Sequence, residues 1–319
     1  MASNDRPTKA QRREEARRKA AELRRKQERE ARRNKIIGIG LLVVAVLAIG
    51  AGIVAVVKHQ SDVNKNKDKY ADAAFTSDTP PNPADSVLRS DTPTPSAQQF
   101  FRPAAADPTL VGIPISSQGV GTAADGGVTV DVYMDFMCPW CGIFEQSQAD
   151  AIQAVLAQDD VTVVYHMVTI TNASSQGTYY ASRAANAASV VADQDPDHFL
   201  AFVVAMMAEG TQPKEGTPGL TDEKIAQVAQ GVGVPTAVTD QFTATADFQG
   251  TQLRTFVPWT AAVTSTFLAS YSSTPTILVD GTPWSGWQDQ TSTLSDAIDA
   301  ARTGAAGDTP SDAATGATD

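Results

Sequence analysis

Cysteine and histidine are scarce in this sequence, which has two cysteines and three histidines in 319 residues. A structural zinc site uses four ligands drawn from several Cys and His side chains, so the scarcity argues against one and we expect no bound metal. The two cysteines, Cys138 and Cys141, are separated by only two residues. A disulfide between them would close a very small loop and remove little chain entropy, so a purely structural bridge is also a poor explanation.

Basic residues are sparse after the first 35 positions. Residues 1–35 carry a net charge of +8 and the whole chain carries −11, which leaves −19 on residues 36–319. Binding to nucleic acid requires Lys and Arg side chains that neutralise phosphates. The acidic body of the chain therefore predicts no nucleic-acid partner.

Charge is absent from residues 36–57, a run of 22 mostly apolar residues. As a helix with a rise of about 1.5 Å per residue, this run would extend roughly 33 Å, enough to cross a bilayer core. A cleaved signal peptide would have a shorter apolar region with its cleavage site directly after it. No cysteine follows the run, which excludes a lipid anchor there. We predict a single transmembrane helix.

The basic residues before this run predict its orientation. Loops rich in Lys and Arg stay in the cytoplasm, so the N-terminus should be cytoplasmic and the body of the chain extracytoplasmic. Disulfides persist in that oxidising compartment. The expected localisation is the cell membrane, with a single pass.

Composition divides the chain into five predicted segments. Residues 1–35 form a basic cytoplasmic tail and residues 36–57 the transmembrane helix. Residues 58–106, rich in Pro, Asp, Ser and Thr, form a disordered extracytoplasmic tether. Residues 107–303 form the folded domain, and residues 304–319, which lack periodicity, form a disordered tail.

Hydrophobic periodicity predicts an α/β domain. Residues 128–136 alternate as a strand, residues 142–158 have the spacing of an amphipathic helix, and residues 161–168 form a second strand. One helix-length connection between two strands implies a parallel pair with a right-handed crossover. Residues 175–271 are predicted to be mostly helical, with one helix over 239–250.

The end of the domain returns to strand structure. A short buried strand over 276–279 precedes an Asp-Gly turn signal and a possible return strand over 282–286. A final helix is predicted over 291–302, since its apolar residues share one face. The chain has no internal repeat.

The spacing of the two cysteines suits dithiol–disulfide exchange. Cys138 falls at the start of a predicted helix, where unpaired N–H groups and the helix dipole stabilise a thiolate and lower its pKa. A thiolate is both the attacking group and the leaving group of exchange, and Cys141 is placed to resolve a mixed disulfide formed at Cys138. Pro139 suits the first helical turn, and Trp140 would shape the rim of the site.

Three other titratable residues lie near the pair in sequence. His166 ends a strand and is interpreted as a core or strand-end histidine rather than a metal ligand. Asp135 and Glu145 are the nearest acidic residues. A buried carboxylate near Cys141 could relay its proton, although a solvated or turn-stabilising role is the more ordinary interpretation.

Two segments resemble a known family. DFMCPWCGIFE at 135–145 and SSTPTILVDGTP at 272–283, with the helical block between them, resemble the DsbA-like branch of the thioredoxin superfamily, in particular its membrane-anchored extracytoplasmic members. The resemblance covers about residues 107–303. It implies a thioredoxin-like α/β fold with a helical domain inserted between the second and third core strands.

The resemblance also implies roles for residues far from the cysteines. Pro275 matches a cis-proline that precedes the third core strand, packs against the active-site pair and keeps metal ions from the thiols. Thr274 matches the residue whose backbone meets a bound peptide. Together with Pro139 and Trp140, it would contact the substrate.

The implied activity is that of an extracytoplasmic thiol:disulfide oxidoreductase with no cofactor, most simply one that oxidises the cysteines of exported proteins. Its partners would be exported proteins with free thiols and a membrane redox protein, either a quinone-linked oxidase or a reductant donor. Two alternatives stay open. One is a reductase or isomerase, for example in cytochrome maturation, and the other is a non-enzymatic module that binds a partner or a metal.

Overall fold

The computed structural model describes residues 55–75, 80–89, 98–289 and 291–304, together with residue 96 and isolated positions between 9 and 52. The predicted tail at 1–35 and transmembrane helix at 36–57 therefore lie almost wholly outside the described residues, as does nearly all of the tail at 304–319. Among the residues that are described, no helix is both long enough and apolar enough to cross a membrane.

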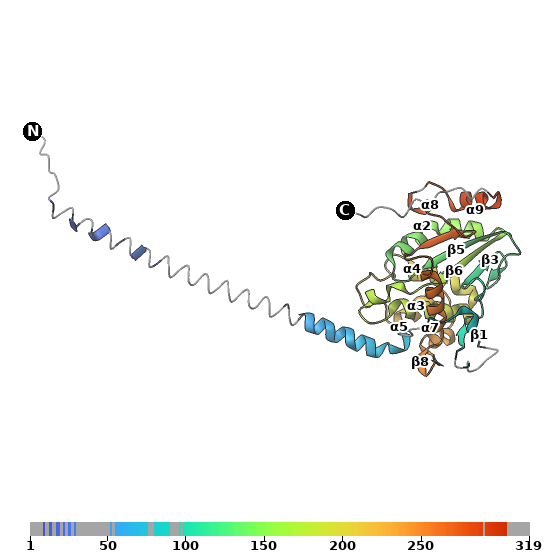
Figure 1. The fold of residues 1–319 in the computed structure, drawn as a ribbon, viewed down its shortest axis with the longest axis horizontal. Helices are drawn as coiled ribbons and strands as arrows, with labels where there is room; N and C mark the ends of the chain where they lie inside the picture. Colours follow the sequence, from blue (N-terminus) through green and yellow to red (C-terminus); the bar gives the residue numbers. More distant parts are fainter. Residues whose placement is uncertain are drawn as a thin grey trace, which may run out of the picture. The chain divides into compact units, whose positions relative to one another are not determined.

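A six-stranded sheet forms the centre of the folded unit, Val63–Asp319 (Figure 1). β5 and β6 are parallel and are connected through α2 (Pro139–Leu156), as predicted, and the other neighbouring strands are antiparallel. In spatial order the strands are β10 (Thr282–Pro283), β9 (Thr276–Val279), β5 (Val128–Met134), β6 (Val161–Met167), β3 (Ile113–Ser116) and β4 (Gly119–Val120).

Helices cover both faces of this sheet. On one face, α2 contacts β6 through Glu145 and Tyr165, and α9 (Leu294–Arg302) and α8 (Gly286–Asp289) pack against α2. On the other face, α7 (Val257–Leu268) packs on β5 through ring contacts with Tyr133. In Figure 1, α2 and α9 lie above the sheet and α7 below it. Every residue of β6 is buried because the strand is covered on both sides.

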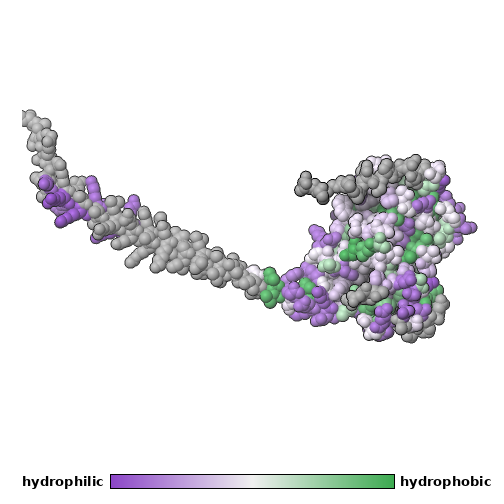
Figure 2. Space-filling view, viewed as in Figure 1, coloured by the Kyte–Doolittle hydropathy of each residue, from purple (hydrophilic) through white to green (hydrophobic). Residues whose placement is uncertain are grey.

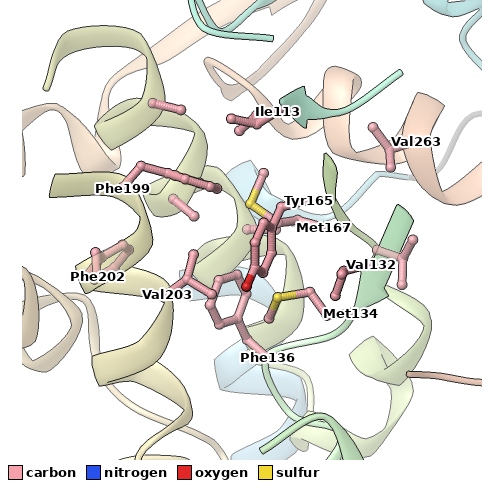
Figure 3. Close-up of a cluster of buried hydrophobic side chains, with 14 of the residues drawn as sticks. Ile113, Val132, Met134, Phe136, Tyr165, Met167, Phe199, Phe202, Val203 and Val263 are labelled. Carbon is pink, nitrogen blue, oxygen red and sulfur yellow. The ribbon is translucent and has the colours of Figure 1, made fainter. Parts of the chain in front are cut away.

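The helical block lies between β6 and β9, where the resemblance implies an inserted domain. Its centre is α3, buried from Tyr180 to Ala192 and rich in alanine, so neighbouring helices approach it closely. Figure 3 shows where this block meets the sheet, with side chains of α4 beside Tyr165 and Met167. The elements of the block before its hairpin are η3 (Ile170–Ser175), α3 (Tyr180–Gln194), η4 (Pro196–His198), α4 (Phe199–Met207), α5 (Asp222–Gly231), α6 (Thr236–Thr239) and η5 (Asp240–Thr243).

One predicted helix of this block is wrong. Where a helix was expected over 239–250, the chain forms only the short turns of α6 and η5 and then a hairpin of β7 (Thr245–Phe248) and β8 (Thr251–Arg254). The two turn residues, Gln249 and Gly250, have φ angles of 53° and 81°. Positive φ at both central residues is the geometry of a two-residue turn whose twist matches that of the flanking strands. A helix cannot continue through residues with positive φ.

The predicted disordered tether at 58–106 needs correction in its described parts. Residues 55–69 are helical, and the chain from Val63 onward belongs to the folded unit. Tyr70 and Ala73 are buried in that unit. Figure 2 shows apolar green at the start of residues 55–69 and polar purple along most of the rest. Composition alone suggested a tether because only a few apolar anchors are spread among many polar residues.

A buried ionic network holds this segment on the helical block. Arg254, which is almost fully buried, donates from Nε to Asp72 at 3.1 Å and from both terminal nitrogens to Asp222 at 2.8 and 2.9 Å. Arg183 also donates to Asp222 at 2.9 Å and lies 4.2 Å from the centre of the Tyr70 ring. Each buried arginine is therefore paired, and the pairing extends to a residue of the predicted tether.

A second part of the predicted tether is also ordered. β1 (Ser86–Leu88) and β2 (Phe100–Arg102) form a short parallel pair. Phe100 and Phe101 are buried, and Phe100 meets Phe248 of the hairpin edge-to-face at 6.0 Å. The folded domain thus begins well before residue 107.

Candidate active site

The turn between β5 and α2 places both cysteines. The Asp135 carbonyl accepts the N–H of Cys138 at 3.1 Å, and the Asp135 carboxylate accepts the N–H of Met137 at 2.9 Å. The N–H of Asp135 in turn lies 3.5 Å from the sulfur of Cys141. Cys138 is the N-cap of α2 and Pro139 is its first residue, a position where the missing N–H of proline is not needed.

The surroundings of Cys138 stabilise its thiolate. Hydrogen bonds lower the pKa of Cys138 to about 6, the first from the thiol of Cys141 and others from the Thr274 side chain and the N–H groups of Cys141 and Trp140, and they outweigh the opposing effect of burial. When the thiol is protonated, it donates to the Thr274 carbonyl at 3.2 Å. Cys138 is thus the more acidic of two free thiols.

Cys141 has the opposite character. It is fully buried one helical turn further along, and burial first, followed by the hydrogen bond and charge of Cys138, raises its pKa well above the ordinary value. The pair is therefore asymmetric, with an acidic outer thiol at Cys138 and a neutral inner thiol at Cys141. This is the distribution that exchange requires, because the thiolate is the reactive form.

The distant residues predicted from the resemblance lie at the pair. The Thr274–Pro275 peptide bond is cis and immediately precedes β9, and Thr274 contacts Cys138 through its carbonyl. Around them, Pro139 is exposed and Trp140 is 60% exposed, and Ile143 on the next turn is 48% exposed. The two thiols thus have an apolar rim on the side of α2.

The two acidic residues of interest are both buried. The Asp135 carboxylate accepts from the hydroxyl and the N–H of Thr171 at 2.6 and 3.0 Å, and burial raises its pKa to about 6. It is a buried group that stabilises the turn. Glu145 accepts only from the Tyr165 hydroxyl, at 3.4 Å, its Oε1 has no partner among the described residues, and burial raises its pKa to about 8.

His166 belongs to a separate buried cluster. Its Nε2 lies 2.9 Å from Asp131 and its Nδ1 lies 3.1 Å from the Val111 carbonyl, and its ring stacks on Tyr133 at 4.0 Å. Both ring nitrogens are therefore engaged away from the cysteines. Within the part of the chain that the structure describes, no group of three His, Cys, Asp or Glu side chains is arranged to hold a metal ion.

Besides Thr171, sequence reasoning missed Gln212, which contacts the turn between β5 and α2 that carries Cys138. Gln212, in the loop after α4, donates from its side-chain amide to the carbonyl of Cys138 at 2.9 Å. The two residues are 74 positions apart in the chain. No local pattern around Gln212 signals this contact, because it depends on how α4 packs against α2.

Comparison with known proteins identifies the family. A family model described as thioredoxin matches residues 120–300, more than half of the chain. The chain belongs to the thioredoxin family. The matched region includes the β5–α2–β6 unit, both cysteines, the helical block and the Thr274–Pro275 bond.

Curated relatives and solved structures add further similarities. The chain is 34% identical to the serine/threonine-protein kinase PknE of Mycobacterium tuberculosis over 113 residues. This match covers 34% of this chain and only 20% of the kinase. The chain is also similar to the reduced disulfide bond oxidoreductase DsbG of the same organism, with 27% identity, a TM-score of 0.46, and coverage of 62% of this chain and 88% of that one. Oxidised DsbA of M. tuberculosis gives 26% identity, a TM-score of 0.47, and coverage of 62% and 94%.

Proposed function

We propose that this protein is an extracytoplasmic thiol:disulfide oxidoreductase that oxidises the cysteines of exported proteins. The observation that carries the proposal is the asymmetry of the pair: the pKa of Cys138 is lowered to about 6 at a helix N-terminus, while Cys141 is fully buried with a raised pKa. Membership of the thioredoxin family supports the same chemistry. A non-enzymatic module would not need two thiols of opposite character.

The reaction begins from the Cys138–Cys141 disulfide. A substrate thiolate attacks the sulfur of Cys138, a mixed disulfide forms, and Cys141 leaves as a thiolate that takes up a proton. A second substrate thiolate then attacks the substrate sulfur of the mixed disulfide. The substrate disulfide forms, and Cys138 departs as a thiolate that its hydrogen bonds stabilise. Two electrons have passed to the pair, and a membrane redox partner removes them.

The substrate site is proposed on the exposed side of the pair. Pro139 and Trp140 offer an apolar surface, and the backbone of Thr274, beside Pro275, offers hydrogen-bonding groups to an extended peptide. Such a site contacts a substrate through its backbone and a few apolar side chains, which suits many different protein substrates.

The opposite direction of electron flow has one observation in its favour. The residue between Pro139 and Cys141 is an exposed tryptophan, which supplies no positive charge to the Cys138 thiolate. A less stabilised thiolate means a less oxidising pair, as in reductases and isomerases. The potential of the Cys138–Cys141 couple separates the two directions, since a value near about −120 mV favours oxidation and one near about −270 mV favours reduction.

The proposed location rests on the apolar run at 36–57 with the basic residues before it. In this proposal residues 1–35 are cytoplasmic and the folded unit is extracytoplasmic, where oxidised substrates persist. The reoxidising partner would be a quinone-linked membrane protein. The test is a reporter that is active only in the cytoplasm, fused after the last residue. If this reporter is active, the proposed topology is refuted.

The activity itself is tested with the Cys141→Ala variant. In this variant the Cys138 thiolate attacks a disulfide of an exported protein and releases one substrate thiolate. Cys141 is absent and cannot break the mixed disulfide again, so acid-quenched and alkylated cells should contain covalent adducts that disappear on reduction. The Cys138→Ala variant, with its single buried thiol, should give none. If folded Cys141→Ala protein forms no adduct with exported proteins, the proposed activity is wrong.

A further inference from the structure

The loop after α4 carries one side chain directly to the active-site turn. Two hydrogen bonds to the Ala208 carbonyl, from the N–H of Thr211 at 3.0 Å and from that of Gln212 at 3.1 Å, fix the loop. The Gln212 side-chain amide donates to the carbonyl of Cys138 at 2.9 Å and lies 3.4 Å from the carbonyl of Phe136 and 3.2 Å from the sulfur of Met207. A residue of the helical block thus holds the N-cap residue of α2.

The other end of the same amide fits against α2. A Cβ atom at Gly142 would collide with Oε1 of Gln212. Gly142 has no positive φ that would otherwise demand glycine, and a helix interior disfavours glycine relative to alanine. The absence of a Cβ at Gly142 therefore leaves room for the Gln212 amide in this position.

The carbonyl and the sulfur of Cys138 compete for the same donor, the N–H of Cys141. The Cys138 carbonyl accepts the N–H of Cys141 at 3.1 Å and that of Gly142 at 3.4 Å. The same Cys141 N–H, with that of Trp140, also stabilises the Cys138 thiolate. The Gln212 amide gives the Cys138 carbonyl a donor from outside the helix. The Cys141 N–H is then more available to the Cys138 sulfur, because one N–H shared between two acceptors binds each less well.

We propose that Gln212 is a positioning residue for Cys138: its amide holds the Cys138 carbonyl and leaves the first-turn N–H groups of α2 directed at the sulfur. This inference rests on the proposed function, because it concerns the reactivity of the same thiol. It also links the helical block to the redox pair. A displacement of the loop after α4 would therefore change the reactivity of Cys138 through Gln212, with no direct contact to the Cys138 sulfur.

Three variants of the full chain test the proposal. Gln212→Met keeps the length of the side chain and removes the donor, and Gln212→Glu replaces the donor with a carboxylate that repels the thiolate. Gly142→Ala displaces the same amide from the opposite side. The matched control is Gln146→Ala. Gln146 also joins α2 to the end of α4, donating to the Met207 carbonyl at 3.0 Å, and among the described residues this bond does not involve the turn that holds Cys138.

The measurement is the pH titration of the thiolate absorbance at 240 nm in the reduced protein, with the reduction potential measured against glutathione. Loss of one hydrogen bond should raise the pKa of Cys138 in Gln212→Met from about 6 to about 7, which lowers the thiolate fraction at pH 6 about five-fold. Gln212→Glu should raise the pKa of Cys138 further. The reduction potential should become more negative from wild type to Gln212→Met to Gln212→Glu. Gly142→Ala should move both values in the direction of Gln212→Met.

Two results would overturn the proposal. One is a thiolate titration of folded Gln212→Met that matches wild type, and the other is an equal change in the Gln146→Ala control. The titration needs no substrate, so it decides the role of Gln212 separately from the activity. Wild-type protein that titrates as expected but exchanges with no disulfide would refute the proposed function and leave the positioning role supported.

Discussion

The buried carboxyl of Glu145 should make the oxidised protein less stable as pH rises from 6 to 8. Its pKa is raised from 4.5 to about 8 in the folded protein because the group is buried, and among the described residues only Tyr165 donates a hydrogen bond to it. Between these values the folded state binds more protons than the unfolded state. The stabilising effect of the protonated form is complete below pH 4.5 and is lost progressively up to pH 8, at about 1.4 kcal/mol per pH unit.

The oxidised protein is required because Cys138 acts in the opposite sense. The pKa of its thiol is lowered from 9.0 to about 6, so the reduced folded protein binds fewer protons than the unfolded chain between these values, and stability rises with pH. Over pH 6 to 8 this rise offsets the effect of Glu145. In the disulfide form neither sulfur titrates. Asp135, whose pKa is raised to about 6, acts in the same sense as Glu145 but mostly below this window.

Glu145→Gln isolates the effect. The amide keeps the shape of the side chain and an oxygen for the Tyr165 hydroxyl, but it has no proton to lose. The free energy of unfolding of the variant should be nearly constant from pH 6 to 8, while that of wild type falls by about 2 kcal/mol, since Glu145 is already half ionised in the folded protein at pH 8. Urea unfolding of the oxidised full chain, followed by the fluorescence of its four tryptophans, measures both.

A matched control is Glu209→Gln, which removes an exposed carboxylate near the end of α4. This variant should leave the pH dependence of the free energy of unfolding unchanged. Parallel stability curves for wild type and Glu145→Gln between pH 6 and 8 would show that Glu145 ionises normally in the folded protein, and the reasoning from burial would be refuted. Reduced wild-type protein should give a much flatter curve than oxidised wild type.

Two further predictions concern stability. Arg254→Met removes a buried guanidinium from Asp72 and from Asp222, which keeps only Arg183 among the described residues, and should cost about 3 to 5 kcal/mol in urea unfolding. Arg302→Met removes two exposed ion pairs, with Asp160 and Asp299, and should leave the midpoint nearly unchanged. Thr293→Ala removes the side-chain cap of α9 and should cost about 1 kcal/mol, measured in the same way, while Thr293→Ser should retain the cap and most of the stability.

Local periodicity was sufficient to predict much of the sheet and its helices. β5, α2 and β6 lie within two residues of their predicted positions except at the start of α2. Burial alternates along β5 and follows one face of α2, while β6, buried throughout, is a short apolar run rich in valine. The hairpin of β7 and β8 was missed because its four-residue strands are too short to show alternation, and Gln249 rather than Asn or Gly precedes the turn glycine.

For the active site, the sequence contained the cysteines but few of their contacts. The resemblance assigned Thr274 and Pro275 to the site of the cysteines, and in the structure the Thr274 carbonyl lies 3.2 Å from the sulfur of Cys138 and the Thr274–Pro275 bond is cis. Gln212 was missed since a single glutamine in a loop has no periodic or compositional signal. The burial of Glu145 was also missed, because a charged residue on a helix is ordinarily solvated and only the packing of α2 on Tyr165 removes it from water.

The docked segment before the domain changes where a stable fragment must begin. Composition changes near residue 107, and a fragment cut there would lose the buried rings of Tyr70, Phe100 and Phe101 and the carboxylate that pairs with Arg254. The compact unit begins at Val63, so a protease that trims the native protein should stop near that residue. Residues 63–75 and 98–106 therefore belong to the folded unit although their composition resembles a linker, and a stable fragment must include them.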